Sequence, residues 1–204
     1  MSGIKKEKKM SSRNDILASI KANKPELIEL PKIDLDVFDD SKNIFDEFIK
    51  KVEIAGGNVF EATSTNDVIS QVELMFPKTK VNFSNLESTE GFNSFSLEEI
   101  KNPHDLDDLD ILILEGGFGV AENGAIWLSD NKMTMRVLPF ITKHLVLVLK
   151  KENIVTFMHQ AYQKLDAEET DFGVFISGPS KTADIEQSLV IGAHGALSLS
   201  VFLV

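Results

Sequence analysis

Hydrophobic residues recur at helical spacing in three stretches of the N-terminal half of the chain. Each stretch ends at a residue that disfavours a continuing helix. Proline follows the first and the third, at Pro25 and Pro77, and the second runs into Gly56-Gly57, which permits a helix C-terminal cap. We therefore expect amphipathic helices at residues 12–22, 42–55 and 65–76.

Short apolar or β-branched runs alternate with these helices. The run at residues 144–149, HLVLVL, is continuously apolar, as expected for a strand that is covered on both faces. Residues 154–165 return to helical period and predict a crossover helix. Because parallel strands need such crossovers, the alternation predicts an α/β fold with an open, largely parallel sheet flanked by helices. The predicted strands span residues 58–62, 80–83, 110–114, 125–128, 144–149, 172–176 and 197–204.

Three further segments do not continue this alternation. Residues 84–108 are polar and irregular, so we expect a surface loop with a short helix near residues 97–100 and no chemistry. Glycines at residues 116, 117 and 119 interrupt the chain between two strands. The segment that follows the strand at 172–176 predicts a helix reaching about Val190, and then a glycine-bounded turn.

The chain length of 204 residues suits one domain with a core of its own. We divide the chain into three parts. Residues 1–10 are expected to be a disordered basic tail, residues 11–40 an N-terminal helix and linker, and residues 41–204 the α/β domain. The basic start is not followed by the apolar stretch of a secretory signal, so we expect a cytoplasmic protein.

Composition excludes several classes of protein. No apolar run approaches the roughly 20 residues that span a bilayer, so we expect no integral membrane protein. The net charge of −11 repels nucleic acid and anionic lipid surfaces. The chain has no cysteine, which rules out disulfides, a thiol nucleophile and an iron–sulfur cluster bound by its own thiolates.

The most polar candidate site is the sequence SGPSKTADIE at residues 177–186, which leaves a predicted strand and enters the predicted helix. Ligands of open α/β sheets bind at the carboxyl edge of the strands, and free N–H groups at a helix start favour anions. A small carboxylate or phosphate is therefore one interpretation, and a simple helix cap is the other. The predicted ligand-binding residues are Ser177, Gly178, Ser180, Lys181, Thr182, Asp184 and Glu186.

A second candidate is the tight turn Ala121-Glu122-Asn123-Gly124 between two apolar strands. A carboxylate held on such a turn can act as a nucleophile, a base or a ligand clamp. The alternative is a hairpin turn with a solvated glutamate. We take Glu122 as a catalytic candidate, and Asn123 and Gly124 as ligand-binding candidates.

Two other residues complete the candidate site. His194, next to Gly195, can exchange a proton with a bound acid or cap a helix end, so we take it as the second catalytic candidate and Gly195 as a ligand-binding one. Arg136 can clamp a carboxylate, although a surface ion pair is the commoner role of a single arginine. The histidines show no metal-ligand spacing, so we expect no metal site.

Four of these segments together resemble the lactate-utilization (LUD) family: AENGA at 121–125, the segment 136–139, SGPSKTADIE at 177–186 and GAHGA at 192–196. The resemblance covers roughly Met10 to Val204. Asn123 and Ala196 depart from it, because the family more often has threonine and proline there. It implies a fold similar to that of sugar-phosphate isomerases and coenzyme A transferases.

The resemblance also implies a function. It suggests an accessory or substrate-handling subunit that acts beside iron–sulfur partner proteins in the oxidation of L-lactate to pyruvate, with a small carboxylate as ligand. A homo-oligomer is left open. The alternatives are a free-standing enzyme of the coenzyme A transferase or ligase type that uses Glu122, and a sensor of small carboxylates without chemistry.

Overall fold

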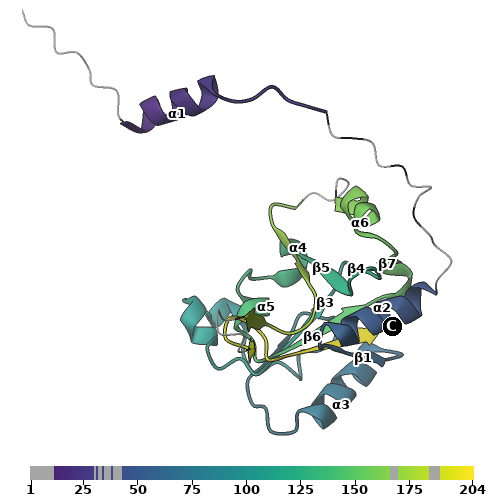
Figure 1. Cartoon of the computed structure of the whole chain (residues 1–204). Coiled ribbons are helices and arrows are strands. Elements are labelled where there is room, and N and C mark those ends of the chain that lie inside the picture. The colour runs from purple at the N-terminus through teal and green to yellow at the C-terminus, as the bar shows by residue number, and fades with distance from the viewer. Residues whose placement is uncertain are drawn as a thin grey trace, which may run out of the picture. The chain divides into compact units, whose positions relative to one another are not determined.

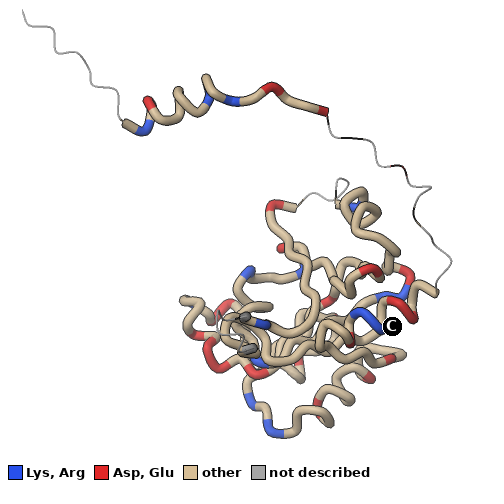
Figure 2. Tube along the Cα trace, viewed as in Figure 1, with Lys and Arg blue, Asp and Glu red and all other residues tan. Residues whose placement is uncertain are grey.

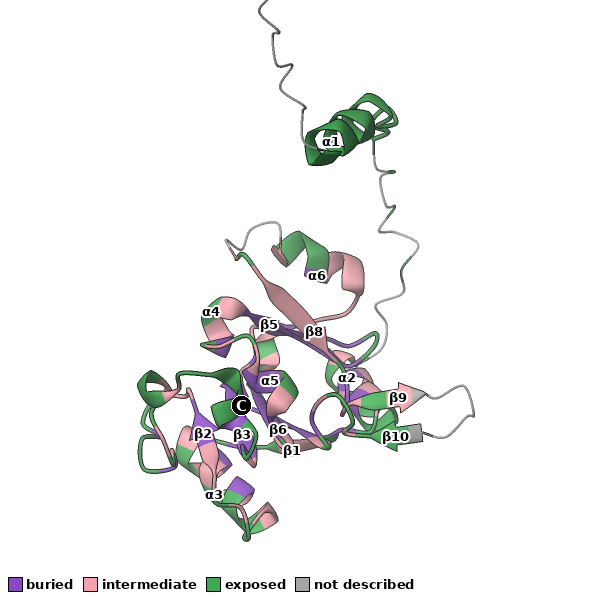
Figure 3. Cartoon of the chain, turned by 90° about the vertical axis from the view of Figure 1, so that its left-hand side faces the viewer, coloured by how far each residue is buried: buried purple, intermediate pink, exposed green. Residues whose placement is uncertain are grey.

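The structure is a computed structural model, and it describes residues 12–29, 31, 34, 38, 43–165, 170–183 and 189–204. The chain divides into two compact units, Met1–Asp39 and Asp40–Val204. In the first unit, α1 (Ser12–Ala22) has the predicted bounds, and all its residues are exposed (Figure 3). The predicted tail at residues 1–10 lies outside the described residues, and so do residues 30, 32, 33, 35–37, 39 and 40 of the predicted linker.

The centre of the second unit is a five-stranded sheet in which every neighbouring pair is parallel (Figure 1). This confirms the predicted fold class. The predicted strands at 58–62, 80–83, 110–114, 144–149 and 197–204 all belong to this sheet, whereas those at 125–128 and 172–176 belong to a second one. The strand order is β1 (Asn58–Glu61), β11 (Ser198–Leu203), β6 (His144–Leu149), β3 (Ile111–Glu115) and β2 (Asn82–Ser84).

The parallel sheet is buried on both faces, which explains its continuous apolar runs. Successive side chains of a strand point to opposite faces, so Leu145 and Leu147 of β6 belong to one core cluster and Val146 and Val148 to another. Helix α3 (Thr65–Met75) covers the second of these faces through residues such as Val72.

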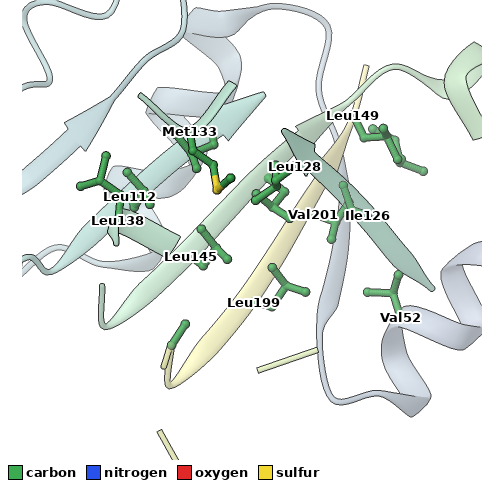
Figure 4. Packing of buried hydrophobic residues seen from close by; sticks show 14 of the residues in the cluster. Val52, Leu112, Ile126, Leu128, Met133, Leu138, Leu145, Leu149, Leu199 and Val201 are labelled. Carbon is green, nitrogen blue, oxygen red and sulfur yellow. The ribbon is translucent and has the colours of Figure 1, made fainter. Parts of the chain in front are cut away.

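A second, four-stranded sheet covers the other face of the parallel sheet. Ile126 and Leu128 of its strand β5 pack in one cluster with Leu145 and Val201 of the parallel sheet (Figure 4). Trp127, between them, points the opposite way, into a smaller cluster beneath α6. The strand order is β7 (Ile154–Val155), β4 (Phe118–Val120), β5 (Ala125–Ser129) and β8 (Gly173–Ile176).

The remaining elements surround these two sheets. Helix α2 contributes Phe48 and Val52 to the main core cluster. Negatively charged Asp and Glu residues outnumber the positively charged Lys and Arg residues along the chain (Figure 2). The elements are α2 (Ile44–Ile54), α4 (Asp130–Met133), α5 (Leu138–Ile141), α6 (Met158–Leu165), the 3-10 helices η2 (Leu97–Glu99), η3 (Pro103–Leu106) and η4 (Lys151–Asn153), and the strands β9 (Lys181–Ala183) and β10 (Leu189–Ile191).

Two of the segments around the second sheet differ from their prediction. The crossover helix at 154–165 begins only at Met158, because Ile154 and Val155 pair with β4 as strand β7. The glycine-rich break at 116–119 is partly strand, since Gly119 pairs with Ile126 in β4 and β5. The partner of Ile154 and Val155 lies far away in the chain, so periodicity alone could not indicate strand β7. Gly119 lies in a local hairpin, where glycine itself hides the strand pattern.

Candidate functional site

The predicted site residues at 177–182 follow strand β8, which runs antiparallel to β5. Ile176 pairs with Ile126, so the chain leaves β8 beside the turn that precedes β5. The Ser177 hydroxyl donates a hydrogen bond of 2.9 Å to the backbone oxygen of Asn123. Two of the predicted segments are thereby in direct contact.

The turn at Glu122 has the tight geometry expected from Asn-Gly. The Gly124 N–H donates to the Val120 oxygen at 2.9 Å, and the Asn123 side-chain oxygen accepts from the Ala125 N–H at 3.0 Å. Gly124 has a φ of +67°, and a Cβ placed there would lie 2.6 Å from the Val52 nitrogen in α2. Glycine is therefore required here by both the backbone conformation and the close approach of α2.

The Glu122 side chain is exposed, and one of its carboxylate oxygens is already used. Oε2 accepts the Met158 N–H at 2.9 Å, at the start of α6, and the Glu122 N–H donates to the Thr156 oxygen at 2.9 Å. The positive N-terminal end of the α6 dipole stabilises a carboxylate in this position. Oε1 makes no hydrogen bond to the described residues, so the side chain can cap α6 and still face a ligand.

The next predicted residues, Gly178 and Lys181, contact the C-terminal end of α2. Gly178 has a φ of +74°, and a Cβ there would lie 2.2 Å from the Ala55 oxygen. The Lys181 ammonium donates a hydrogen bond to that same oxygen. The cation predicted to grip a ligand thus caps the C-terminus of α2 (Figure 3, where β9 lies beside α2).

The Ser180 segment meets the segment that holds His194. Ser180 N–H donates to the Ala196 oxygen at 2.9 Å, and Gly192 N–H donates to the Ser180 oxygen at 3.0 Å. A Cβ on Gly195 would lie 3.1 Å from the Ser180 Cβ. His194 is exposed and Ser180 half-buried, so the imidazole and the hydroxyl are both within reach of a small molecule from solvent.

The helix predicted after Ser180 is wrong at both of its described ends. Lys181–Ala183 and Leu189–Ile191 are instead the antiparallel strands β9 and β10, with Thr182 opposite Val190. The anion cradle built on free helix N–H groups is therefore absent at residues 181–183. Asp184 and Glu186, which were predicted to line that helix start, lie outside the described residues.

Arg136 is not part of this cluster. Its guanidinium donates to Asp130 Oδ2 at 3.0 Å and lies 5.0 Å above the Phe172 ring. Asp130 follows the end of β5 and Phe172 precedes β8, whereas Glu122 and Ser177 lie at the opposite ends of these strands. Arg136 therefore forms a surface ion pair, which was the alternative to a carboxylate clamp.

The cluster also lies at an edge of the parallel sheet that the sequence did not predict. Ser180 bonds to the residues just before β11, and Lys181 bonds to those just before β1, so these loops lie at the amino edge. The expected carboxyl-edge position fails because β8 belongs to the second sheet and runs antiparallel to β5.

The carboxyl edge of the parallel sheet holds a cavity of about 540 Å³ that sequence reasoning missed. Asn85 and Glu87, which line it, fall in the loop from which we expected no chemistry. The signal that points there is the S-x-x-D capping pattern at Ser64–Asp67, directly after the predicted strand at 58–62. We name this space the carboxyl-edge cavity.

Neither a metal-ligand cluster nor a membrane-spanning helix occurs among the described residues. No group of three or more of their His, Asp or Glu side chains is placed to hold a metal ion. None of the helices in this part of the chain is both long and apolar enough to cross a membrane.

Comparison with known proteins identifies the family. The model of the LUD domain matches residues 95–204, more than half of the chain. The chain therefore belongs to the LUD domain family. A crystal structure of a DUF162 family protein from Deinococcus radiodurans has the same fold, with a TM-score of 0.61 and 16% identity over 78% of this chain and 95% of that one.

Curated relatives of this chain share one name, lactate utilization protein C. The protein from Oceanobacillus iheyensis is 31% identical over 91 residues, and that from Bacillus pumilus is 34% identical over 93 residues. These alignments cover 42% and 43% of this chain but only 39% of each relative. The protein from Halalkalibacterium halodurans is 26% identical over 73% of this chain and 67% of its own length.

Proposed function

We propose that this chain is a cytoplasmic, substrate-handling subunit in the oxidation of L-lactate to pyruvate, and that it acts with iron–sulfur partner proteins. The observation that carries the proposal is membership of the LUD family together with relatives named lactate utilization protein C. The oxidation releases two electrons and two protons from each lactate. The partners' iron–sulfur clusters accept the electrons.

The chain itself offers no thiolate ligands for such a cluster. Thiolates are the usual ligands of iron–sulfur clusters, and the sequence has none. Its contribution is to hold the carboxylate of the substrate. The Ser180 hydroxyl and the His194 imidazole lie on segments that contact each other, and both can donate to that carboxylate. The free oxygen of Glu122, on the turn that Ser177 contacts, can only accept, so it faces the hydroxyl of lactate.

Growth on L-lactate as the sole carbon source tests the proposal. Deletion of the gene is expected to abolish this growth, and the tagged chain is expected to co-purify with proteins that show the visible absorbance of iron–sulfur clusters. Normal growth of the deletion strain, with no cluster-bearing partner, would reject the proposal.

Point variants test whether Ser180 and His194 contribute to lactate oxidation. We expect His194→Ala and Ser180→Ala to lower lactate-dependent dye reduction in extracts, because each removes a hydrogen-bonding group for a carboxylate. His104→Ala is the matched control, since His104 is an exposed histidine on η3. Equal activity of His194→Ala and His104→Ala would remove His194 from the site.

A second candidate function is supported by the exposure of Glu122. In an enzyme of the coenzyme A transferase type, the Glu122 carboxylate attacks the thioester carbon of an acyl-coenzyme A, and coenzyme A leaves as its thiolate. An acyl-glutamyl anhydride then remains on the protein. Peptide mass mapping after incubation with acyl-coenzyme A tests this function, since an unmodified Glu122 peptide contradicts it.

A third possibility is a sensor of small carboxylates that catalyses no reaction. In that case the Glu122→Gln variant keeps the full function of the protein.

A further inference from the structure

The carboxyl-edge cavity is built by the ends of all five parallel strands. Thr63 and Ser64 follow β1, Asn85 follows β2, Glu115 ends β3 and Lys150 follows β6, while Val204 follows β11. In open α/β sheets this edge is where ligands bind. The volume of about 540 Å³ lies within the range of roughly 300–1,000 Å³ that is typical of small-molecule sites.

Charge in this cavity is unevenly neutralised. Glu115 forms an ion pair of 2.7 Å with Lys132, and the neighbouring Lys151 forms one of 2.8 Å with Glu61. Lys150 is exposed and has no carboxylate within 4.0 Å among the described residues. The cavity therefore contains one ammonium group that the described part of the protein leaves without a counter-ion, in a chain whose net charge is −11.

The wall formed by the start of α3 adds hydrogen-bond donors. The Ser64 hydroxyl accepts the Asp67 N–H at 3.2 Å, and Asp67 Oδ2 accepts the Thr63 N–H at 3.0 Å. The N–H groups of Thr65 and Asn66 have no acceptor among the described residues. Free N–H groups in the first turn of a helix favour an anion, and Thr65 lines the cavity.

The carboxylates on the opposite side restrict the ligand further. Glu87 and Glu115 also line the cavity, and of the two only Glu115 has an ion-pair partner among the described residues, so an anion without hydrogen-bond donors meets repulsion there, mainly from Glu87. A ligand with hydroxyl groups can place its anionic end towards Lys150 and α3 and donate its hydroxyls to these two carboxylates. A simple inorganic anion can interact with Lys150 and α3 but has no carbon-bound hydroxyl groups to donate to the carboxylates.

We infer that the carboxyl-edge cavity is a binding site for a small hydroxylated anion, whose carboxylate or phosphate is held by Lys150 and the first turn of α3. The inference goes beyond the proposed function, because it concerns a different edge of the sheet and holds whether or not the chain takes part in lactate oxidation.

Titrations followed by NMR of the backbone amides test this inference on the full chain. The probes are L-lactate, glycerol 3-phosphate and inorganic phosphate. We expect the Thr65 and Asn66 amide signals to shift with at least one hydroxylated probe, and that probe identifies a carboxylate or a phosphate as the preferred anion. Shifts confined to Ser177 and Ser180, or no shifts with any probe, would overturn the inference.

Variants of adjacent lysines provide a matched comparison. Lys150→Met is expected to weaken binding of the hydroxylated probe about tenfold, the loss expected for one charge-assisted hydrogen bond. Lys151→Met changes the net charge equally but removes a lysine that already has a partner, so we expect little effect. If both variants weaken binding equally, the attraction is a general charge effect and no site exists.

Whereas Lys150→Met should weaken binding, Glu115→Gln should strengthen the binding of inorganic phosphate. It releases Lys132 from its ion pair and removes one repelling carboxylate, so inorganic phosphate should bind more tightly while the preference for glycerol 3-phosphate over phosphate falls. An unchanged preference contradicts the role given to Glu115. Failure of the lactate growth test leaves all these titrations unaffected, so the two proposals can fail separately.

Discussion

Asp110 joins three strands of the parallel sheet at their amino ends. Its Oδ2 accepts the N–H groups of Lys80 and Val81 at 2.9 and 3.1 Å, and its Oδ1 accepts the Lys143 ammonium at 2.7 Å. Burial of the carboxyl acts to raise the pKa of Asp110, but the hydrogen bonds from Lys143, Lys80 and Val81 outweigh it and lower the pKa from 3.8 to about 2.

The magnitude follows from that difference. A fall from 3.8 to about 2 corresponds to about 2 kcal/mol of stabilisation of the folded state at neutral pH. The Lys143 side chain is 45% exposed, so water screens part of the attraction. We therefore expect Asp110→Asn to lower the free energy of unfolding at pH 7 by about 1–2 kcal/mol.

The sign of the pH dependence is fixed by the direction of the pKa change. A lowered pKa means that the unfolded chain binds the proton first, so the stabilisation is complete above about pH 4 and is lost as the pH falls towards about 2. The difference between wild type and Asp110→Asn should shrink over that window, because the amide does not titrate.

Urea unfolding followed by the fluorescence of Trp127, the single and buried tryptophan, measures this difference at each pH. Glu152→Gln is the control, since Glu152 is exposed and forms no ion pair with the described residues. A difference that stays constant from pH 7 to pH 3, or one that the control reproduces, would refute the reasoning.

Two further predictions concern the turn at Glu122. Gly124→Ala should lower the free energy of unfolding by about 2–4 kcal/mol, from the left-handed backbone and the clash with Val52, while Gly91→Ala, which has open space around it, should have little effect in the same urea assay. Equal effects would contradict the packing of this turn on α2. Glu122→Ala should cost about 1 kcal/mol by removing the acceptor for the Met158 N–H, whereas Glu122→Gln should keep most of it. Thermal unfolding of both variants checks this, and equal melting temperatures would show that the cap does not stabilise α6.

Much of the fold could be predicted from sequence because its signals are local. The apolar run at 144–149 alternates between two core clusters, and only a strand buried on both faces needs such a run. Proline and glycine mark the ends of α2 and α3 to within one or two residues. The Asn-Gly turn at Glu122 likewise follows from residues that are adjacent in the chain.

The position of the candidate site depended on tertiary structure. The pattern of residues 173–176 predicts a strand but cannot say which sheet it joins, and its antiparallel pairing with β5 carries Ser177–Lys181 to the amino edge. Residues 181–183 are too short and too polar to distinguish a strand from a helix start. Their pairing with 189–191 decides between the two.

The carboxyl-edge cavity shows the same division. The sequence alone determined that strands would alternate with helices, and hence that some carboxyl edge would exist, because periodicity reports how each segment buries its own side chains. Only the tertiary structure decided that the ends of β1, β2, β3, β6 and β11 enclose one space there and that Lys150 is left without a partner among the described residues. Strand order and ion pairing join residues far apart in the chain, and no local pattern encodes them.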